Sequence, residues 1–364
     1  MRTVTIRWLA ALAMLIPVFA LAGLSAAQTP EINIPPSAMS APLGEEHRQV
    51  IRAYLQDWAS QMKSATSTEQ VTQLRRQLAE AFNQYNNPNY RLAFAQLASQ
   101  ELPGLLTEMK EPLKQINLAI ALSQMSQVGI QPALDKMVSH PNPAVRFFGW
   151  QGYRNIRMLV LAQGPSFIKD MYQAIDTAAA KEQSDCVLRA LYPMLAYWGP
   201  RESYVNSAAY AEASGRSLDL FAQVWKRQGE SVERGEIPAI RSVQVGLREL
   251  KAVARAREND PAGQLPVLQM VVSTMQAAAK GYQAVGGEGL AADELRVLLL
   301  DIEEAVNLVT KARQQYLRMA LDVRGAPDRV DAVLLAADQT WMTELAKGGF
   351  DVQAATQSTS PAGN

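Results

Sequence analysis

The chain offers few of the side chains that most enzymes use for nucleophilic catalysis or metal binding. Its 364 residues include one cysteine, Cys186, and two histidines, His47 and His140. A single cysteine excludes an internal disulfide and any metal site built from several thiolates. A lone histidine without ligand-type neighbours is typical of a surface or helix-capping role. We therefore predict no catalytic residue and no metal site.

The sequence also lacks the short motifs that carry chemistry in many enzyme families. It contains no phosphate-binding loop, no dinucleotide fingerprint, no zinc-protease His-Glu-x-x-His and no hydrolase elbow. One glycine cluster, residues 286–289, has neither a preceding strand nor a following lysine, so it predicts a turn between helices. We accordingly predict no cofactor.

Five acidic residues crowd one predicted helix: Asp293, Glu294, Asp301, Glu303 and Glu304. Paired carboxylates can act as a general acid and a general base. Asp301 and Glu304, however, lie three positions apart and opposite the apolar stripe that contains Ile302. The spacing therefore favours a solvated helix face over a catalytic pair.

Aromatic residues are dense between positions 147 and 198. If successive helical hairpins stack, part of this set could gather on one concave surface and bind another protein. The alternative is that these rings fill the core of an irregular stack. The candidate binding residues are Phe147, Trp150, Tyr153, Tyr197 and Trp198.

The charge balance argues against a nucleic-acid partner. The chain has 35 basic and 35 acidic residues, and loss of Arg2 and Arg7 with a leader would leave 33 against 35, a formal charge of −2. Nucleic-acid-binding domains instead carry a basic patch or a strong positive charge. Hydrophobic residues make up 48% of the chain and charged residues 19%, which indicates a packed globular body.

The amino terminus has the pattern of a secretory signal peptide. Arg2 and Arg7 precede the apolar run 8–24, and small residues follow at 25–27. We predict residues 1–27 to be a signal peptide cleaved after Ala27, so that the mature protein is periplasmic or secreted. The alternative is an uncleaved anchor, since 17 apolar residues lie at the lower edge of what spans a bilayer. A membrane contact is expected only in that case.

Export affects what we expect of the single cysteine, because an exposed free thiol is unfavourable in an oxidising compartment. Val187 and Leu188 place Cys186 beside an apolar helix face. We predict that the thiol is buried; pairing with another chain is the alternative.

Two segments are predicted to lack regular secondary structure. Residues 28–44 contain four prolines, which withhold the backbone N–H that a helix or sheet would use, and they predict a linker. The last residues, 351–364, are small and polar and predict a disordered tail.

Between these segments the apolar residues follow helical spacing, which predicts an all-α fold. Residues 51–62 give one stripe and residues 71–85 give the next. Thr66 and Glu69 have the spacing of a capping box ahead of the second stripe. Strand-like alternation and hairpin turns of the Asn-Gly or Asp-Gly type do not occur.

Residues 121–156 contain a helix, a short second helix and then Asn142-Pro143-x-Val145-Arg146. Asn142 is suited to cap a helix, Pro143 suits its first turn, and Val145 points inward. This segment resembles a HEAT-type repeat of the kind that builds α-solenoids. The resemblance implies that Arg146 bridges to acidic or carbonyl groups of a neighbouring repeat.

The resemblance extends, more weakly, over residues 85–198. A partial second copy starts at Asn87-Pro88, and bulky Phe147, Phe148 and Trp150 occupy positions that the family usually fills with smaller residues. We predict a HEAT-like solenoid of helical hairpins over residues 45–230; an irregular helical bundle is the alternative.

The carboxy-terminal part shows heptads instead. Leu295, Ile302, Val309 and Tyr316 recur every seven residues, which predicts a long helix over 290–322. Similar seams occur upstream. We predict an up-and-down helical bundle over residues 236–348.

Two functions fit these observations. The first is an exported, non-enzymatic scaffold that binds a protein partner through its helical-repeat surface. The alternative is an exported small-ligand-binding protein or enzyme with a carboxylate and aromatic pocket between the two helical halves. Fold resemblance alone identifies neither the partner nor a ligand.

Overall fold

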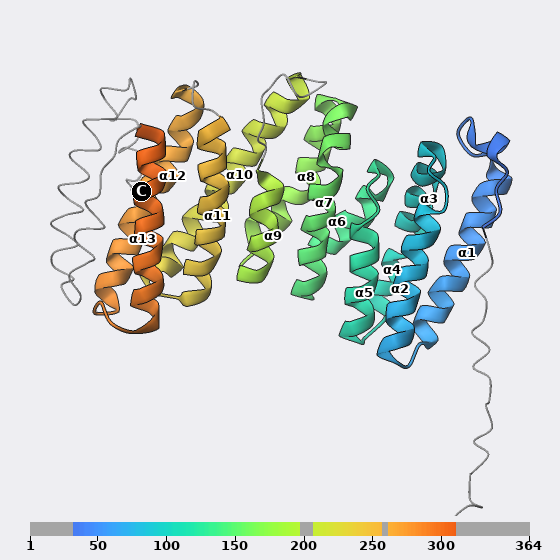
Figure 1. Cartoon of the computed structure of the whole chain (residues 1–364), viewed down its shortest axis with the longest axis horizontal. Helices are drawn as coiled ribbons and strands as arrows, with labels where there is room; N and C mark the ends of the chain where they lie inside the picture. Colours follow the sequence, from blue (N-terminus) through green and yellow to red (C-terminus); the bar gives the residue numbers. More distant parts are fainter. Residues whose placement is uncertain (1–31, 197–206, 257–260, 311–364) are drawn as a thin grey trace, which may run out of the picture.

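The computed structural model describes residues 32–196, 207–256 and 261–310, and this part of the chain is all helical (Figure 1), which confirms the predicted all-α class. The first segments are η1 (Pro36–Met39), α1 (Glu45–Ser64), α2 (Thr68–Asn83), α3 (Pro88–Glu101), α4 (Pro103–Glu108), α5 (Pro112–Ser123) and η2 (Val128–Ile130). They are followed by α6 (Gln131–Val138), α7 (Pro143–Gln163), α8 (Pro165–Lys181), α9 (Asp185–Leu195), α10 (Ser207–Glu233), α11 (Ile237–Ala256), α12 (Pro261–Ala284) and α13 (Gly289–Thr310).

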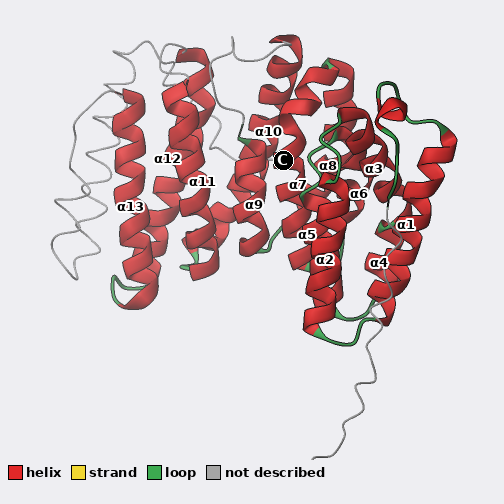
Figure 2. Cartoon of the chain, turned by 45° about the vertical axis from the view of Figure 1, so that its right-hand side comes forward, coloured by secondary structure: helices red, strands yellow, loops and turns green. Residues whose placement is uncertain are grey.

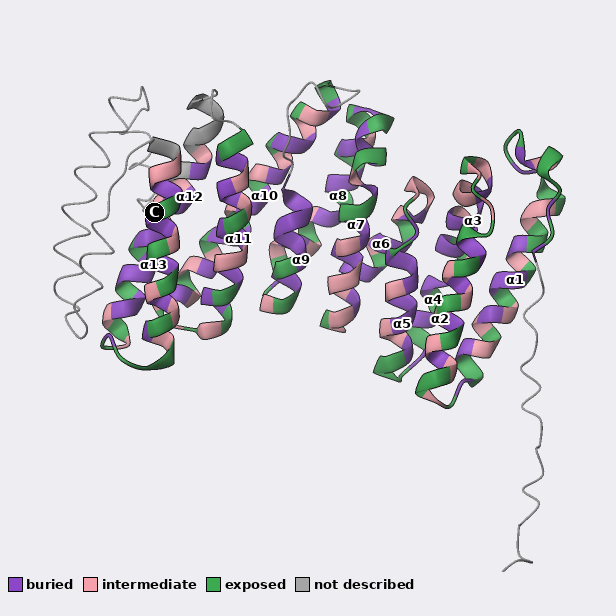
Figure 3. Cartoon of the chain, viewed as in Figure 1, coloured by how far each residue is buried: buried purple, intermediate pink, exposed green. Residues whose placement is uncertain are grey.

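The helices pack in two rows (Figures 1 and 2). One row consists of α1, α3, α6, α8, α10 and α12, each in contact with the next; the other consists of α2, α5, α7, α9, α11 and α13. Apolar side chains from both rows form a single buried cluster; Figure 3 colours the buried residues of each helix purple. Each hairpin therefore buries its apolar faces against the hairpins before and after it.

The predicted boundary between a repeat region and a separate bundle is not a packing boundary. Helix α10 contacts both α8 and α12, and α9 contacts α11, so the two rows continue across residues 230–236. The predicted seam is itself correct where α13 is described, since Leu295 and Ile302 are buried. A heptad identifies the buried stripe of a helix but not the helix that covers it. The predicted extension of this helix beyond Thr310 lies outside the described residues.

The prediction of a linker over residues 28–44 is wrong for residues 32–44, which pack against the first helices. Its buried side chains are those of Ile32, Ile34, Met39 and Leu43. The backbone oxygen of Ile32 accepts hydrogen bonds from Gln84 Nε2 at 2.7 Å and from the Tyr85 hydroxyl at 3.0 Å. Prolines prevent a regular helix here, but they leave the apolar side chains between them free to be buried.

A capping box opens α2, one residue later than predicted. The Ser67 side chain accepts from the backbone N–H of Gln70, and the Gln70 side chain accepts from the backbone N–H of Ser67, both at 3.2 Å. Thr66 and Ser67 both carry the hydroxyl that a cap needs, so the residue types alone did not distinguish them.

We expect Ser67→Ala to lower the free energy of unfolding by about 1 kcal/mol, because the first turn of α2 loses its side-chain acceptor. Thr66→Ala is the matched control and should change it by less than about half of that, since the backbone N–H of Thr66 still donates to Gln70. Urea unfolding followed by circular dichroism measures both values. Equal losses in the two variants would contradict the assignment of Ser67 as the cap.

The glycine cluster forms a turn, as predicted. Gly286, Gly287 and Gly289 all have positive φ, between 71° and 84°; the first two lie in the connection from α12 to α13, and Gly289 begins α13. Side chains with a Cβ rarely adopt this backbone conformation.

None of the helices in residues 32–310 that the structure describes combines the length and the apolarity needed to cross a membrane. The predicted signal peptide (1–27) and the predicted tail (351–364) lie outside the described residues.

Candidate functional site

The segment that resembles a HEAT repeat forms the corner between α6 and α7. The Asn142 side chain accepts from the backbone N–H of Ala144 at 2.9 Å and thereby caps α7. Pro143 occupies the first position of the helix, and Val145 is fully buried. These three residues have the local roles that their types indicate.

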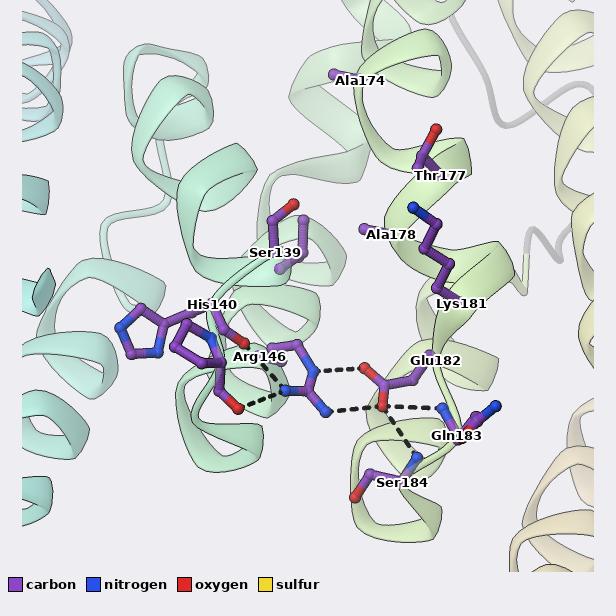
Figure 4. A pocket seen from close by; sticks show the side chains of 12 residues that line it. Ser139, His140, Arg146, Ala174, Thr177, Ala178, Lys181, Glu182, Gln183 and Ser184 are labelled. Carbon is purple, nitrogen blue, oxygen red and sulfur yellow. Dashed lines mark hydrogen bonds and ion pairs between the residues drawn. The ribbon is translucent and has the colours of Figure 1, made fainter.

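Arg146 links this corner to the turn between α8 and α9 (Figure 4). Its Nε and Nη2 donate to the two carboxylate oxygens of Glu182 at 2.7 and 3.0 Å. Its Nη1 donates to the backbone oxygens of His140 and Pro141, each at 2.9 Å. Arg146 thus contacts an acidic side chain of the next hairpin, as the resemblance implies, whereas the two carbonyls belong to its own segment. The hydrogen bonds with Glu182 raise the pKa of Arg146.

Glu182 is buried, with its side chain only 2% exposed, and is fully engaged. Besides Arg146, its carboxylate accepts from the backbone N–H groups of Gln183 and Ser184 at 3.1 and 3.0 Å. These donors satisfy both oxygens of the buried carboxylate. The pair therefore joins one hairpin to the next and offers no free base for catalysis.

His140 has the capping role that the sequence predicts. Its ring is buried, Nδ1 accepts from the backbone N–H of Asn142 at 3.1 Å, and Nε2 lies 3.2 Å from the backbone oxygen of Leu106. A neutral imidazole that donates from Nε2 satisfies both contacts. His47 lies on α1 at 3.4 Å from the exposed carboxylate of Glu46.

A groove of about 470 Å³ opens beside the Arg146–Glu182 pair, between the corner after α6 and the carboxy-terminal half of α8 (Figure 4). We call it the corner groove. Ser139, Thr177 and Lys181 line it with two hydroxyls and one exposed ammonium group. Because the guanidinium of Arg146 is already engaged, the groove suits hydrogen bonding to a polar surface better than tight binding of an anion.

The predicted aromatic surface is wrong for Trp150 and Tyr153, which are fully buried. Their ring centroids lie 6.1 Å apart in the core, and the alternative prediction of a packing role therefore holds for both. Phe147 is half-buried and packs edge-on against Phe148, with ring centroids 5.2 Å apart. Helix α7 is covered by α5, α6 and α9, which leaves Trp150 and Tyr153 no open surface, whereas Phe147 and Phe148 keep part of theirs. Tyr197 and Trp198 lie outside the described residues.

Tyr153 instead takes part in a contact that the sequence did not predict. Its hydroxyl donates to the carboxylate of Asp135 on α6. Burial raises the pKa of Asp135, and the hydrogen bond from Tyr153 partly offsets this rise. Burial and the nearby Asp135 charge raise the pKa of Tyr153 well above its ordinary value. The two residues are 18 positions apart on different helices, so no local spacing signals the contact.

We expect Asp135→Asn to be more stable than the wild type at pH 7. The folded-state pKa of Asp135 is raised, so the free energy of unfolding of the wild type falls as the pH rises through the interval between the unfolded and folded pKa values. An asparagine removes this titration, yet its oxygen can still accept from Tyr153. The gain should vanish below a pH of about 3.9, where the unfolded state also binds the proton.

Urea unfolding between acidic and neutral pH measures this difference. Asp170→Asn, at an exposed position of α8, is the matched control and should show no such pH-dependent gain. A gain of the same size at both ends of the pH range would contradict the assignment to Asp135.

Cys186 is exposed, so the prediction of a buried thiol is wrong. Val187 and Leu188, its neighbours on α9, take the inward face of the helix and are fully buried. The residue before them points outward, with its Sγ 3.0 Å from the hydroxyl of Ser184.

The acidic cluster of α13 is not simply a solvated face. Lys251 on α11 donates to Asp301 at 3.2 Å and to Glu304 at 2.7 Å, and its own side chain is only 9% exposed. The hydrogen bond and charge of Lys251 lower the pKa of Glu304. Arg241 makes the equivalent link to Glu294 at 2.7 Å, while Glu303 is buried. Asp301, Glu304 and Glu294 thereby join α13 to α11.

Two further grooves lie in the same row of helices as the corner groove. The junction groove, of about 320 Å³, lies between α8 and α10 and is lined by Asp176, Thr177, Arg216 and Asp219 among others. The other, of about 580 Å³, is bounded by α3, the start of α6 and α8. In the part of the chain that the structure describes, no cluster of three or more His, Cys, Asp or Glu side chains is placed to hold a metal ion.

The chain matches no protein-family model and no curated protein sequence. The resemblance to HEAT repeats therefore depends on residues 121–156 and on the contacts that their side chains make.

Proposed function

We propose that the protein is an exported, non-enzymatic scaffold of HEAT-like helical hairpins that binds a protein partner along the row formed by α3, α6, α8 and α10. The observation that supports this proposal is the placement of three neighbouring grooves on that one row. Two of them share Thr177, so the row offers adjacent contacts to one extended surface. Export is inferred from the leader at residues 1–27.

The short length of α6 accounts for two of the grooves. Helix α6 has eight residues, whereas α3 and α8 on either side have 14 and 17. At 1.5 Å per residue, α6 is about 12 Å long and α8 about 25 Å long. The row is therefore hollowed at both ends of α6, and a complementary surface could enter there.

The linings of these grooves favour a macromolecular partner. Two of them, the corner groove and the groove at the start of α6, are lined mainly by hydroxyls, carboxamides and alkyl groups from several helices. The junction groove differs, because Asp176, Arg216 and Asp219 line it. A catalytic site usually concentrates titratable groups with shifted pKa values in one pocket, whereas a protein interface spreads polar and apolar contacts over a wide area.

Site-specific photo-crosslinking in intact cells tests the proposal. A photoreactive amino acid replaces Lys181 or Gln223, which line two of the grooves, or Arg154 or Met158, which are exposed on α7 in the other row. We expect one discrete adduct from the groove positions and none from the α7 positions. Adducts from both rows alike, or from neither, would contradict a docking face on the α3–α10 row.

One observation favours the alternative of a small-ligand site or enzyme. Burial raises the pKa of Asp176 in the junction groove, with partial compensation by the charge of Arg216. A carboxyl group with a raised pKa in a groove is a candidate for binding or transferring a proton. Under this alternative, a metabolite screen finds a compound that raises the melting temperature of the wild type but not that of Asp176→Asn.

A further inference from the structure

We propose that the groove bounded by α3, the turn η2 and α8 binds an extended, uncharged peptide segment of the partner through its main chain. We call it the amide groove; it is lined by Gln96, Ser99, Gln100, Val128, Gly129, Gln131, Pro132 and Phe167. The inference depends on the proposed function and names the chemistry of the partner at one site. At about 580 Å³ it falls within the size range of about 300–1,000 Å³ that is usual for ligand sites.

The polar groups of the amide groove are carboxamides and one hydroxyl, without any charged side chain. A carboxamide has an oxygen that accepts and a nitrogen that donates, the same pair of functions that a peptide group carries. A charged ligand would lose its hydration here without meeting an opposite charge. The lining therefore selects for neutral hydrogen-bonding groups.

The carboxamides leave both a donor and an acceptor for a ligand. Arg48 donates to Gln96 Oε1 at 3.2 Å, so the hydrogen-bond donor Nε2 is the group of the Gln96 side chain that is left for a ligand. The Oε1 atom of Gln131 has no hydrogen-bond partner in the described structure and is buried, so this carboxamide must turn toward the groove before a ligand can reach it. A buried acceptor without a donor is unfavourable, and a ligand N–H that reached it would relieve this cost.

An extended segment fits these groups better than a helix does. Within a helix the peptide groups hydrogen bond to one another, whereas an extended chain presents free N–H and C=O groups along its length. The donor at Gln96 lies on α3 and the acceptor at Gln131 on α6, so an extended chain that runs between the two helices would meet them from opposite sides.

The apolar part of the lining suits the side chains of such a segment. Phe167 on α8 is half-buried, and Val128 and Pro132 add alkyl surface. In an extended chain, alternate side chains point to opposite faces, so one apolar residue can contact Phe167 while its neighbours face solvent.

Gly129 fixes the edge of the groove. A Cβ atom at this position would lie 2.7 Å from Gln96 Cγ and 3.1 Å from the backbone nitrogen of Gln96. The turn η2 can therefore lie directly on α3, and this contact sets the position of Gln131 relative to Gln96.

The test uses the full-length protein and a library of short random peptides displayed on phage. Peptides selected on the wild type are synthesised with a fluorescent label, and their affinities are measured by fluorescence polarisation. We expect the selected peptides to lack charged residues at their centre. Gln131→Leu and Phe167→Ala should each weaken binding about tenfold or more, and methylation of the central backbone nitrogens should do the same.

Gln73→Leu is the matched control, since Gln73 is an exposed glutamine on α2 in the other row, and it should leave the affinity within about twofold. Thermal unfolding establishes that each variant is folded. Selected peptides that are charged, helical when bound, or insensitive to Gln131→Leu and Phe167→Ala would overturn the inference, as would the absence of any enrichment. The photo-crosslinking result is independent of this assay, so a partner on the row without peptide binding would leave the proposed function standing and reject the amide groove.

Discussion

Arg146→Ala is expected to lower the free energy of unfolding by about 3 kcal/mol, the low end of the range for breaking a buried ion pair. The change removes both side-chain donors to the Glu182 carboxylate, whose side chain is 2% exposed. It also removes the donor shared by the backbone oxygens of His140 and Pro141. The loss of stability stays at the low end of this range because Glu182 keeps the hydrogen bonds from the backbone N–H groups of Gln183 and Ser184.

Three matched variants separate this contact from the general loss of an arginine. Arg154→Ala, at an exposed position of the same helix, should change the free energy by less than about 0.5 kcal/mol. Arg146→Lys keeps the charge but lacks the planar fork, so it should fall between wild type and Arg146→Ala. Glu182→Gln in the Arg146→Ala background should recover part of the loss, because it removes the unpaired charge.

Urea unfolding at neutral pH gives all four values. If Arg146→Ala were as stable as Arg154→Ala, the link between the α6–α7 corner and the α8–α9 turn would not contribute to the packing of successive hairpins. The interpretation of residues 121–156 as a HEAT-like repeat would then lose its main physical support.

The parts of this site that could be predicted from sequence are those that depend on neighbours in the chain. The cap by Asn142 and the first-turn position of Pro143 follow from residue type and from adjacency to one helix start. The acceptor for Arg146 is 36 residues further along, and no local pattern selects Glu182 over the other acidic residues.

The burial of the aromatic residues also depends on segments that are distant in the sequence. Trp150 and Tyr153 are three positions apart, which places them on one face of α7, and that much is correct. Whether the face is open or covered depends on α5, α6 and α9, whose positions the local spacing does not give. The amide groove was missed for this reason as well, since Gln96, Gln131 and Phe167 come from three separate helices.

Gly246→Ala is expected to lower the free energy of unfolding by about 2 kcal/mol, although alanine is the better helix former by about 1 kcal/mol. A Cβ atom at this position of α11 would lie 2.3 Å from Cζ3 of Trp225 and 3.1 Å from the ring of Tyr192. The Trp225 ring has little room to move, because its Nε1 donates to the backbone oxygen of Met270 at 3.1 Å. Steric strain at this contact should therefore outweigh the gain in helix propensity.

Gly229→Ala is the matched control, with the opposite sign expected. Gly229 also lies inside a helix, but the nearest atom to its added Cβ is that of Ala277 at 3.9 Å, an ordinary contact. Removing this helical glycine should raise the free energy of unfolding by about 0.5–1 kcal/mol.

The sign of the Gly246→Ala effect reports whether the two rows are continuous. Tyr192 and Trp225 belong to the part of the chain predicted as a repeat region, and Gly246 belongs to the part predicted as a separate bundle. If the halves packed separately, alanine at 246 would meet neither ring and would stabilise the protein as Gly229→Ala does. One continuous stack requires that Gly246→Ala lowers the free energy of unfolding and that Gly229→Ala raises it. Urea unfolding measures both values. Only in a continuous stack does the backbone of α11 lie against the rings of α9 and α10.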